Sequence, residues 1–124
     1  TFSDRLRAVH SATGGDLDRI DTKFLRGQKI DINGLSAQIS RHIKKGEFDL
    51  IILDALYRFL PPGVSESDNN GMMTVYNTVD EIAATTGAAI MLVHHTSKGD
   101  QSGKAVTDVG SGAGVISRAT DTHL

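Results

Sequence analysis

Two short apolar runs, each ending on polar side chains, constrain this chain most. Residues 49–54 read Asp-Leu-Ile-Ile-Leu-Asp, and residues 89–95 read Ala-Ile-Met-Leu-Val-His-His. An apolar run of this length between polar residues is typical of a buried parallel strand. In open α/β sheets, ligands bind outside the carboxyl ends of the strands. Asp54, His94 and His95 are therefore predicted to face one crevice, where the chemistry of this protein would take place.

In the rest of the chain, helical periodicity and turn residues predict the helices, the shorter strands and the loops. Apolar residues at helical spacing predict three helices, over residues 1–13, 33–46 and 72–86. Asn33 is the expected N-cap of the second helix, and Gly87 ends the third. Further short strands are predicted over residues 22–25 and 120–124, with a long loop over 57–71. Strands that alternate with helices favour parallel pairing through right-handed crossovers, so the predicted fold class is α/β.

Length and composition exclude several classes of protein. The 124 residues suffice for one modest core, and the absence of cysteine excludes a disulfide framework or a cysteine-based zinc finger. Residues 1–45 carry nine Lys and Arg against five Asp and Glu, and residues 46–124 carry four against ten. This asymmetry is too small to indicate nucleic-acid binding by itself. The longest apolar stretch, at 88–93, is far shorter than a membrane span, and the first residues show no signal-peptide pattern. We therefore expect a cytoplasmic protein.

The side chains at the two strand ends allow more than one kind of site. Asp54 can hold Mg²⁺ through water, as in phosphoryl transfer, or it can simply cap a turn. His94 and His95 project to opposite faces if the strand continues through them, so one can face a nucleotide while the other packs behind it. The Thr-Ser-Lys run that follows, ending at Lys98, adds donors for a phosphate. Zinc binding is a weaker alternative, because adjacent strand histidines diverge and no third ligand has metal spacing.

The segment after the second strand has a different composition. Residues 96–112 are rich in glycine and serine and are predicted to form an exposed, mobile loop. Its Lys98 and Lys104 either belong to a solvated surface or contact phosphates of DNA or of a neighbouring subunit's nucleotide. The Gly-Ser-Gly-Ala-Gly run at 110–114 lacks the G-x-x-x-x-G-K-[ST] spacing of a phosphate-binding loop. We interpret this run as a loop that enters a helix.

Four motifs in a fixed order resemble a known family. They are Ile-Ile-Leu-Asp at 51–54, Val-His-His-Thr-Ser-Lys at 93–98, Asp-Val-Gly-Ser-Gly-Ala at 108–113 and Ala-Thr-Asp at 119–121. In this order they resemble the RecA-like hexameric helicase ATPases, a group of P-loop NTPases. The resemblance is closest to the plasmid RepA and AAA_25-type members and more distant to the DnaB type. It spans nearly all of the chain, and the HHTSKG segment together with the downstream GSGA is its most specific part.

The resemblance implies roles for the strand-end residues. Asp54 corresponds to the Walker-B aspartate, which holds Mg²⁺ through water. His95 corresponds to the polar sensor residue at the end of the neighbouring strand, and both are implied to be catalytic. His94 and Lys98 are implied to lie with them at the nucleotide.

Other implied roles fall in the last quarter of the chain. Residues 96–109 correspond to a region that faces the central channel of the hexamer, so Lys98 and Lys104 are implied to bind DNA. Arg118 is placed where a basic residue reaches a neighbour's phosphate. Asp121 corresponds to an acidic residue at the start of the next strand.

One departure from the family pattern is large. No Walker-A loop occurs in the 124 residues, and the glutamate-bearing strand expected before the first helix is also absent. We therefore expect residues 1–124 to be the C-terminal part of a RecA-like core, a three-layer fold with a mainly parallel sheet, truncated on its P-loop side. In such cores the sensor strand lies between the Walker-B and P-loop strands. Residues 49–53 and 89–93 should thus be adjacent and parallel, and residues 120–124 should lack a partner strand in the chain.

The resemblance implies that the chain is part of an ATP-dependent DNA helicase or translocase. ATP and Mg²⁺ are the implied cofactors, and the complete protein is implied to be a hexameric helicase or translocase on single-stranded DNA. It would act in replication of a plasmid, phage or mobile element, and the isolated chain would be inactive. Two alternatives remain open: a non-catalytic α/β module that binds subunits or partners, and a receiver-like domain with Asp54 as phosphoacceptor. A receiver needs an additional acidic pair, for which residues 16, 18 and 21 are poor candidates because they follow a helix.

Overall fold

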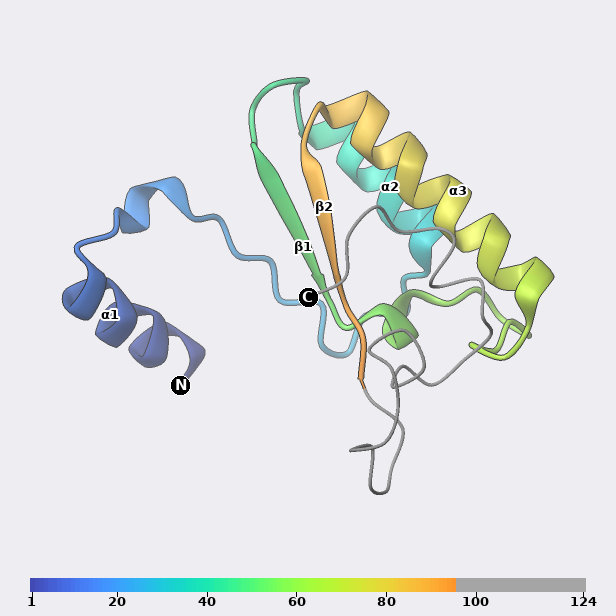
Figure 1. Cartoon of the computed structure of the whole chain (residues 1–124), viewed down its shortest axis with the longest axis horizontal. Helices are drawn as coiled ribbons and strands as arrows, with labels where there is room; N and C mark the ends of the chain where they lie inside the picture. The colour runs from blue at the N-terminus through green and yellow to red at the C-terminus, as the bar shows by residue number, and fades with distance from the viewer. Residues whose placement is uncertain (96–124) are drawn as a thin grey trace, which may run out of the picture.

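The computed structural model describes residues 1–95, which form three α-helices, two 3₁₀ turns and one small sheet (Figure 1). The α-helices are α1 (Phe2–Thr13), α2 (Ile32–His42) and α3 (Asn69–Thr86). Two 3₁₀ turns, η1 (Leu17–Arg19) and η2 (Leu56–Phe59), accompany them, and the strands are β1 (Leu50–Asp54) and β2 (Ala89–Val93). Predictions about residues 96–124, including the loop at 96–112 and the strand at 120–124, lie outside the described residues.

The sheet confirms the predicted pairing of the two apolar runs. β1 and β2 are parallel, with Leu50 opposite Ala89 and Asp54 opposite Val93. A parallel pair requires a long crossover, which η2 and α3 supply. The described part of the chain is therefore a small α/β unit with a two-stranded parallel sheet.

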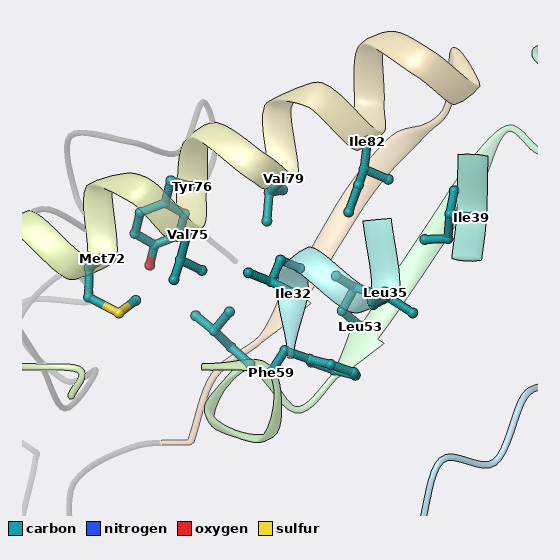
Figure 2. Close-up of a cluster of buried hydrophobic side chains, with 11 residues drawn as sticks. Ile32, Leu35, Ile39, Leu53, Phe59, Met72, Val75, Tyr76, Val79 and Ile82 are labelled. Atoms are coloured by element: carbon teal, nitrogen blue, oxygen red, sulfur yellow. The ribbon is translucent and has the colours of Figure 1, made fainter. Parts of the chain in front are cut away.

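The core lies between one face of this sheet and the pair formed by α2 and α3. Figure 2 shows side chains from both helices, β1 and η2 meeting there. The buried hydrophobic residues of this cluster are Ile32, Leu35, Ile39, Leu53, Leu56, Phe59, Met72, Val75, Tyr76, Val79 and Ile82. Full burial of one such aliphatic side chain stabilises a fold by about 1.5–3 kcal/mol. Val75, Val79 and Ile82, which recur at helical spacing along α3, are among these buried residues.

The opposite face of the sheet is open. Side chains alternate between the two faces of a strand, and those that point away from α2 and α3 remain exposed, at 45% for Leu50, 55% for Ile52 and 37% for Met91. Within residues 1–95, helices cover one face of the sheet (Figure 1). The three-layer arrangement and the truncation on the P-loop side stay predictions.

Helix α1 has the predicted bounds but does not join the core. Thr1 and Asp4 form a capping box at its start, and Gly14 ends it with φ 69°, a left-handed conformation that favours glycine. None of its residues is buried. It lies beyond the β1 edge of the sheet (Figure 1), where the Phe2 ring meets Phe24 edge to face at 5.7 Å.

One predicted strand is absent, and three predicted helix ends are wrong. Residues 22–25 form no strand, and Phe24 is 63% exposed. The N-cap of α2 is Asp31, whose carboxylate accepts the Gly34 N–H, and this helix ends at His42 instead of near residue 46. Helix α3 starts at Asn69, three residues earlier than predicted. The segment 57–71 is correspondingly shorter as a loop, because η2 and α3 occupy its ends.

No helix among the described residues is long and apolar enough to cross a membrane.

Candidate functional site

The register of the sheet brings the predicted site residues to one edge. Asp54 is the last residue of β1, and its partner in β2 is Val93. His94 and His95 directly follow Val93, so both histidines lie at the same carboxyl edge as Asp54. This confirms that the acid and the two histidines share one end of the sheet. Ligands of parallel sheets bind at this end.

The Asp54 carboxylate is available to a ligand. The residue is exposed, and within residues 1–95 it makes no ion pair and no side-chain hydrogen bond. It lines, together with Arg58, a wide, open cleft between β1 and the part of the chain before α2, including α1. The peptide bond from Asp54 to Ala55 is cis. A single exposed carboxylate fits the way proteins usually hold Mg²⁺, with one or two carboxylates, several waters and the substrate's phosphates completing the shell.

His94 is mostly buried and faces a carboxylate. Its Nε2 lies 3.4 Å from Oε2 of Glu66, and the two side chains are 16% and 20% exposed. Neither ring nitrogen of His94 has a hydrogen-bond partner among residues 1–95. The contact is therefore an electrostatic one, which becomes a full ion pair when the ring is protonated. It holds the loop before α3 against the end of β2.

Close packing fixes the loop that carries Glu66. Gly71 lies in the first turn of α3, and a Cβ at this position would be 2.8 Å from Cγ1 of Val64 and 2.5 Å from Oδ2 of Asp68. A larger residue at position 71 would therefore force the Val64 and Asp68 side chains to shift. Asp68 also caps α3, accepting the Asn70 N–H at 3.1 Å. Glu66 therefore stands in a loop that packs against the first turn of α3.

The Glu66 carboxylate also influences Tyr76. Burial raises the pKa of the Tyr76 hydroxyl to about 12, and the negative charge of Glu66 adds to this effect. Glu66 thus acts on two buried groups, the His94 ring and the Tyr76 hydroxyl, from one position behind the sheet edge.

His95 has different surroundings from His94. Its side chain is exposed, and its ring meets the ring of Tyr57 at a centroid distance of 5.6 Å and an interplanar angle of 61°. The guanidinium of Arg58 lies over the Tyr57 ring, 5.7 Å from its centroid. Of the two histidines, His95 is therefore the one open to a ligand, and His94 is the one held from behind.

Several predicted site residues fall beyond the described region. Lys98, Lys104, Arg118 and Asp121 all lie after residue 95, outside the described residues. Up to residue 95, no group of three or more His, Cys, Asp or Glu side chains is placed to hold a metal ion. The zinc alternative therefore gains no support from this part of the chain.

The structure adds Glu66 and Tyr57 to the neighbourhood of the site, and neither was predicted. Glu66 stands in a loop with proline, glycine and serine, and nothing in its spacing indicates a return to the end of β2. Tyr57 had a usable signal, since it follows Asp54 by three residues and so lies just outside the carboxyl end of a parallel strand.

Comparison with known proteins agrees with this geometry. Residues 1–101 match the model of the AAA_25 family, which is described as an AAA domain. Neither the search of curated proteins nor the search of solved structures finds a match. The match covers most of the 124 residues and includes the whole described sheet and the HHTSKG segment. The chain therefore belongs to the AAA_25 family of AAA-type P-loop ATPases.

Proposed function

We propose that this domain takes part in Mg²⁺-dependent ATP hydrolysis as the motor of a DNA helicase or translocase. The observation that carries the proposal is the convergence of Asp54 and His95 at the carboxyl edge of a parallel sheet, in a chain of an ATPase family. Such a motor would act in the replication of a plasmid, phage or mobile element.

The two strand ends have separate tasks in this proposal. Asp54 orients the hydrated metal ion through water, using the carboxylate that faces the cleft. When bound, Mg²⁺ would neutralise charge on the phosphates of the substrate. His95 is exposed at the neighbouring strand end, where its ring can donate a hydrogen bond to the γ-phosphate as charge develops there. His94, held by Glu66, fixes the backbone from which His95 projects.

Binding of the triphosphate needs residues outside these 124. The G-x-x-x-x-G-K-[ST] motif that cradles the β- and γ-phosphates does not occur in the sequence. We infer that the full-length protein supplies it and that the isolated chain hydrolyses no ATP. Lys98 is the proposed additional phosphate donor from within this chain.

The proposed DNA contacts and the hexameric ring rest on the sequence. Lys98 and Lys104 lie in a glycine- and serine-rich segment with almost no bulky apolar residues, and their ammonium groups are suited to contacting the phosphates of single-stranded DNA. A ring of identical subunits would place this segment from each subunit around one channel.

The receiver-like alternative has no specific observation in its favour. A receiver-like phosphoacceptor requires acidic groups clustered about Asp54, and the described residues contain no such cluster of three or more possible ligands. A non-catalytic partner-binding module leaves the exposed carboxylate at the strand end without a role.

The test is a comparison of charge-removing variants in the full-length protein. Asp54→Asn keeps the shape of the side chain and should lower kcat by at least about 10²-fold while the circular dichroism spectrum stays unchanged. Asp49→Asn is the matched control, because Asp49 is an exposed carboxylate at the opposite end of the same strand. The control should retain activity.

The sensor role of His95 has its own control. His95→Ala should lower kcat with a smaller change in nucleotide affinity, since a sensor acts mainly in the transition state. His42→Ala removes another exposed histidine, at the end of α2, and should change neither. Full activity in Asp54→Asn, or ATP hydrolysis by the isolated 124-residue chain, would refute the proposed function.

A further inference from the structure

The turn that follows β1 presents an aromatic ring to solvent from a fixed position. η2 is anchored by two buried side chains, Leu56 at 1% and Phe59 at 5% exposure. Between them stands Tyr57, which is 49% exposed. The hydrophobic core is filled at this turn by Leu56 and Phe59, so packing of the core does not explain why the Tyr57 ring is half exposed.

Two neighbours orient this ring. His95, from the end of β2, meets it edge-on at 5.6 Å, and the Arg58 guanidinium lies over it at 5.7 Å. Arg58 lies over one face of the ring, and about half of Tyr57 is open to solvent. The ring therefore needs little ordering when it binds, which lowers the entropic cost of binding.

We propose that Tyr57 and Arg58 form a nucleotide subsite, in which the Tyr57 ring stacks on a nucleobase and the Arg58 guanidinium binds an adjacent phosphate. The chemistry is that of a stacking platform beside a cation, the combination that proteins use for nucleotides and single strands. This inference depends on the proposed function in one respect: a nucleotide or single-stranded DNA has to bind at this edge of the sheet.

Two sources can supply such a base. One is the ATP whose phosphates lie at Asp54 and His95, and the other is single-stranded DNA that passes the same edge. Arg58 supports both, because it lines the cleft at Asp54 and is also exposed beside Tyr57. The chemistry of recognition is the same, so two probes are needed to tell the sources apart.

The experiment measures the affinity of the full-length protein for Mg-ATP and for fluorescein-labelled oligo(dT). Stacking of one base on an aromatic ring is worth about 1–3 kcal/mol, so Tyr57→Ala should weaken one of the two probes by about 5- to 150-fold. Tyr57→Phe keeps the ring and should stay within about twofold of the wild type on the same principle. Met73→Ala, which removes a large exposed side chain of α3 that does not line the cleft at Asp54, is the control and should leave both affinities unchanged.

The pattern of losses identifies the source and separates this inference from the proposed function. A loss for Mg-ATP alone assigns the base of ATP, and a loss for oligo(dT) alone assigns DNA. Unchanged affinity for both probes in Tyr57→Ala, or binding of neither probe by the wild type, overturns the subsite. If Asp54→Asn loses ATP turnover while Tyr57→Ala keeps both affinities, the ATPase proposal stands and the subsite alone is wrong.

Discussion

The Thr86 hydroxyl stabilises the junction between α3 and β2, and replacing it tests the energetics of the fold directly. Thr86 is fully buried, and its Oγ1 donates to the Ile82 carbonyl at 2.7 Å. The same oxygen accepts the N–H of Ala88 at 3.2 Å. Thr86→Val keeps the shape of the side chain but leaves this buried N–H without its partner.

The magnitude follows from the desolvation of one amide. An unsatisfied buried backbone donor costs about 1–3 kcal/mol, whereas the Ile82 carbonyl loses little because it keeps its helical hydrogen bond. We therefore expect Thr86→Val to lower the free energy of unfolding by about 2 kcal/mol. In urea this corresponds to a midpoint about 1–2 M lower, given a slope of about 1–2 kcal/mol/M for a domain of this size.

Thr74→Val is the matched control. Thr74 lies on the same helix and its hydroxyl donates to the Asn70 carbonyl at 3.3 Å, but the residue is exposed and no amide depends on it. The free energy of unfolding of the Thr74→Val variant should differ from that of the wild type by less than about 0.5 kcal/mol. If urea unfolding gives the two variants the same midpoint, the hydroxyl-to-amide bond does not stabilise the junction and the reasoning is refuted.

Three further predictions concern the titration of Tyr76, the effect of the Glu66 charge on it and the local stability of α1. Because the folded pKa of Tyr76 is raised to about 12, its contribution is complete below about pH 10 and is lost as the pH rises from 10 to 12. Stability should fall by about 1–3 kcal/mol over this range, more than in Tyr76→Phe, and identical urea midpoints at every pH would contradict this. Glu66→Gln should lower the pKa of Tyr76 yet leave it above its ordinary value, because burial is the larger cause of the shift. This pKa can be measured from the absorbance at 295 nm in a Tyr57→Phe background, in which Tyr76 is the only tyrosine. The amides of α1 should exchange with deuterium far faster than those of central α3, because α1 buries no residue and a helix of 12 residues is marginal alone; the reverse order would show that α1 is packed.

The parts of the fold that the sequence predicted well are those with strong local signals. The two apolar runs became paired strands because no other segment in the described region is as apolar over five residues. The ends of α1 and α3 were predicted at Gly14 and Gly87, where φ is 69° and 72° and an L side chain would be strained. Local chemistry alone determines such ends.

The errors arose where tertiary packing decided between local alternatives. Asp31 and Asn33 are both good N-caps, two residues apart. Ile32 is fully buried, so the helix has to start before it, and Asp31 takes the cap. Asn33 instead accepts a hydrogen bond from the Thr78 hydroxyl at 3.3 Å, which ties α2 to α3. That contact depends on two helices meeting, which no local pattern reveals.

The site was predictable only in its outline. Parallel pairing was enough to place Asp54, His94 and His95 at one edge, because strand ends of a parallel sheet meet. The different surroundings of the two histidines depend on Glu66 and Tyr57, which reach them through the fold of separate segments. The distinction between the buried and the accessible histidine therefore came from the structure.

The open face and the two unpaired edges of the sheet affect how readily the chain associates with other chains while it folds. In the described region each strand pairs only with the other, so both outer edges carry backbone groups that no strand within residues 1–95 satisfies. The adjoining face exposes Leu50, Ile52 and Met91. Unpaired edges beside apolar side chains recruit further strands, including those of other copies. While the chain is being synthesised and folded, strands exposed in this way are therefore prone to pair with strands of other chains, which is a route to aggregation.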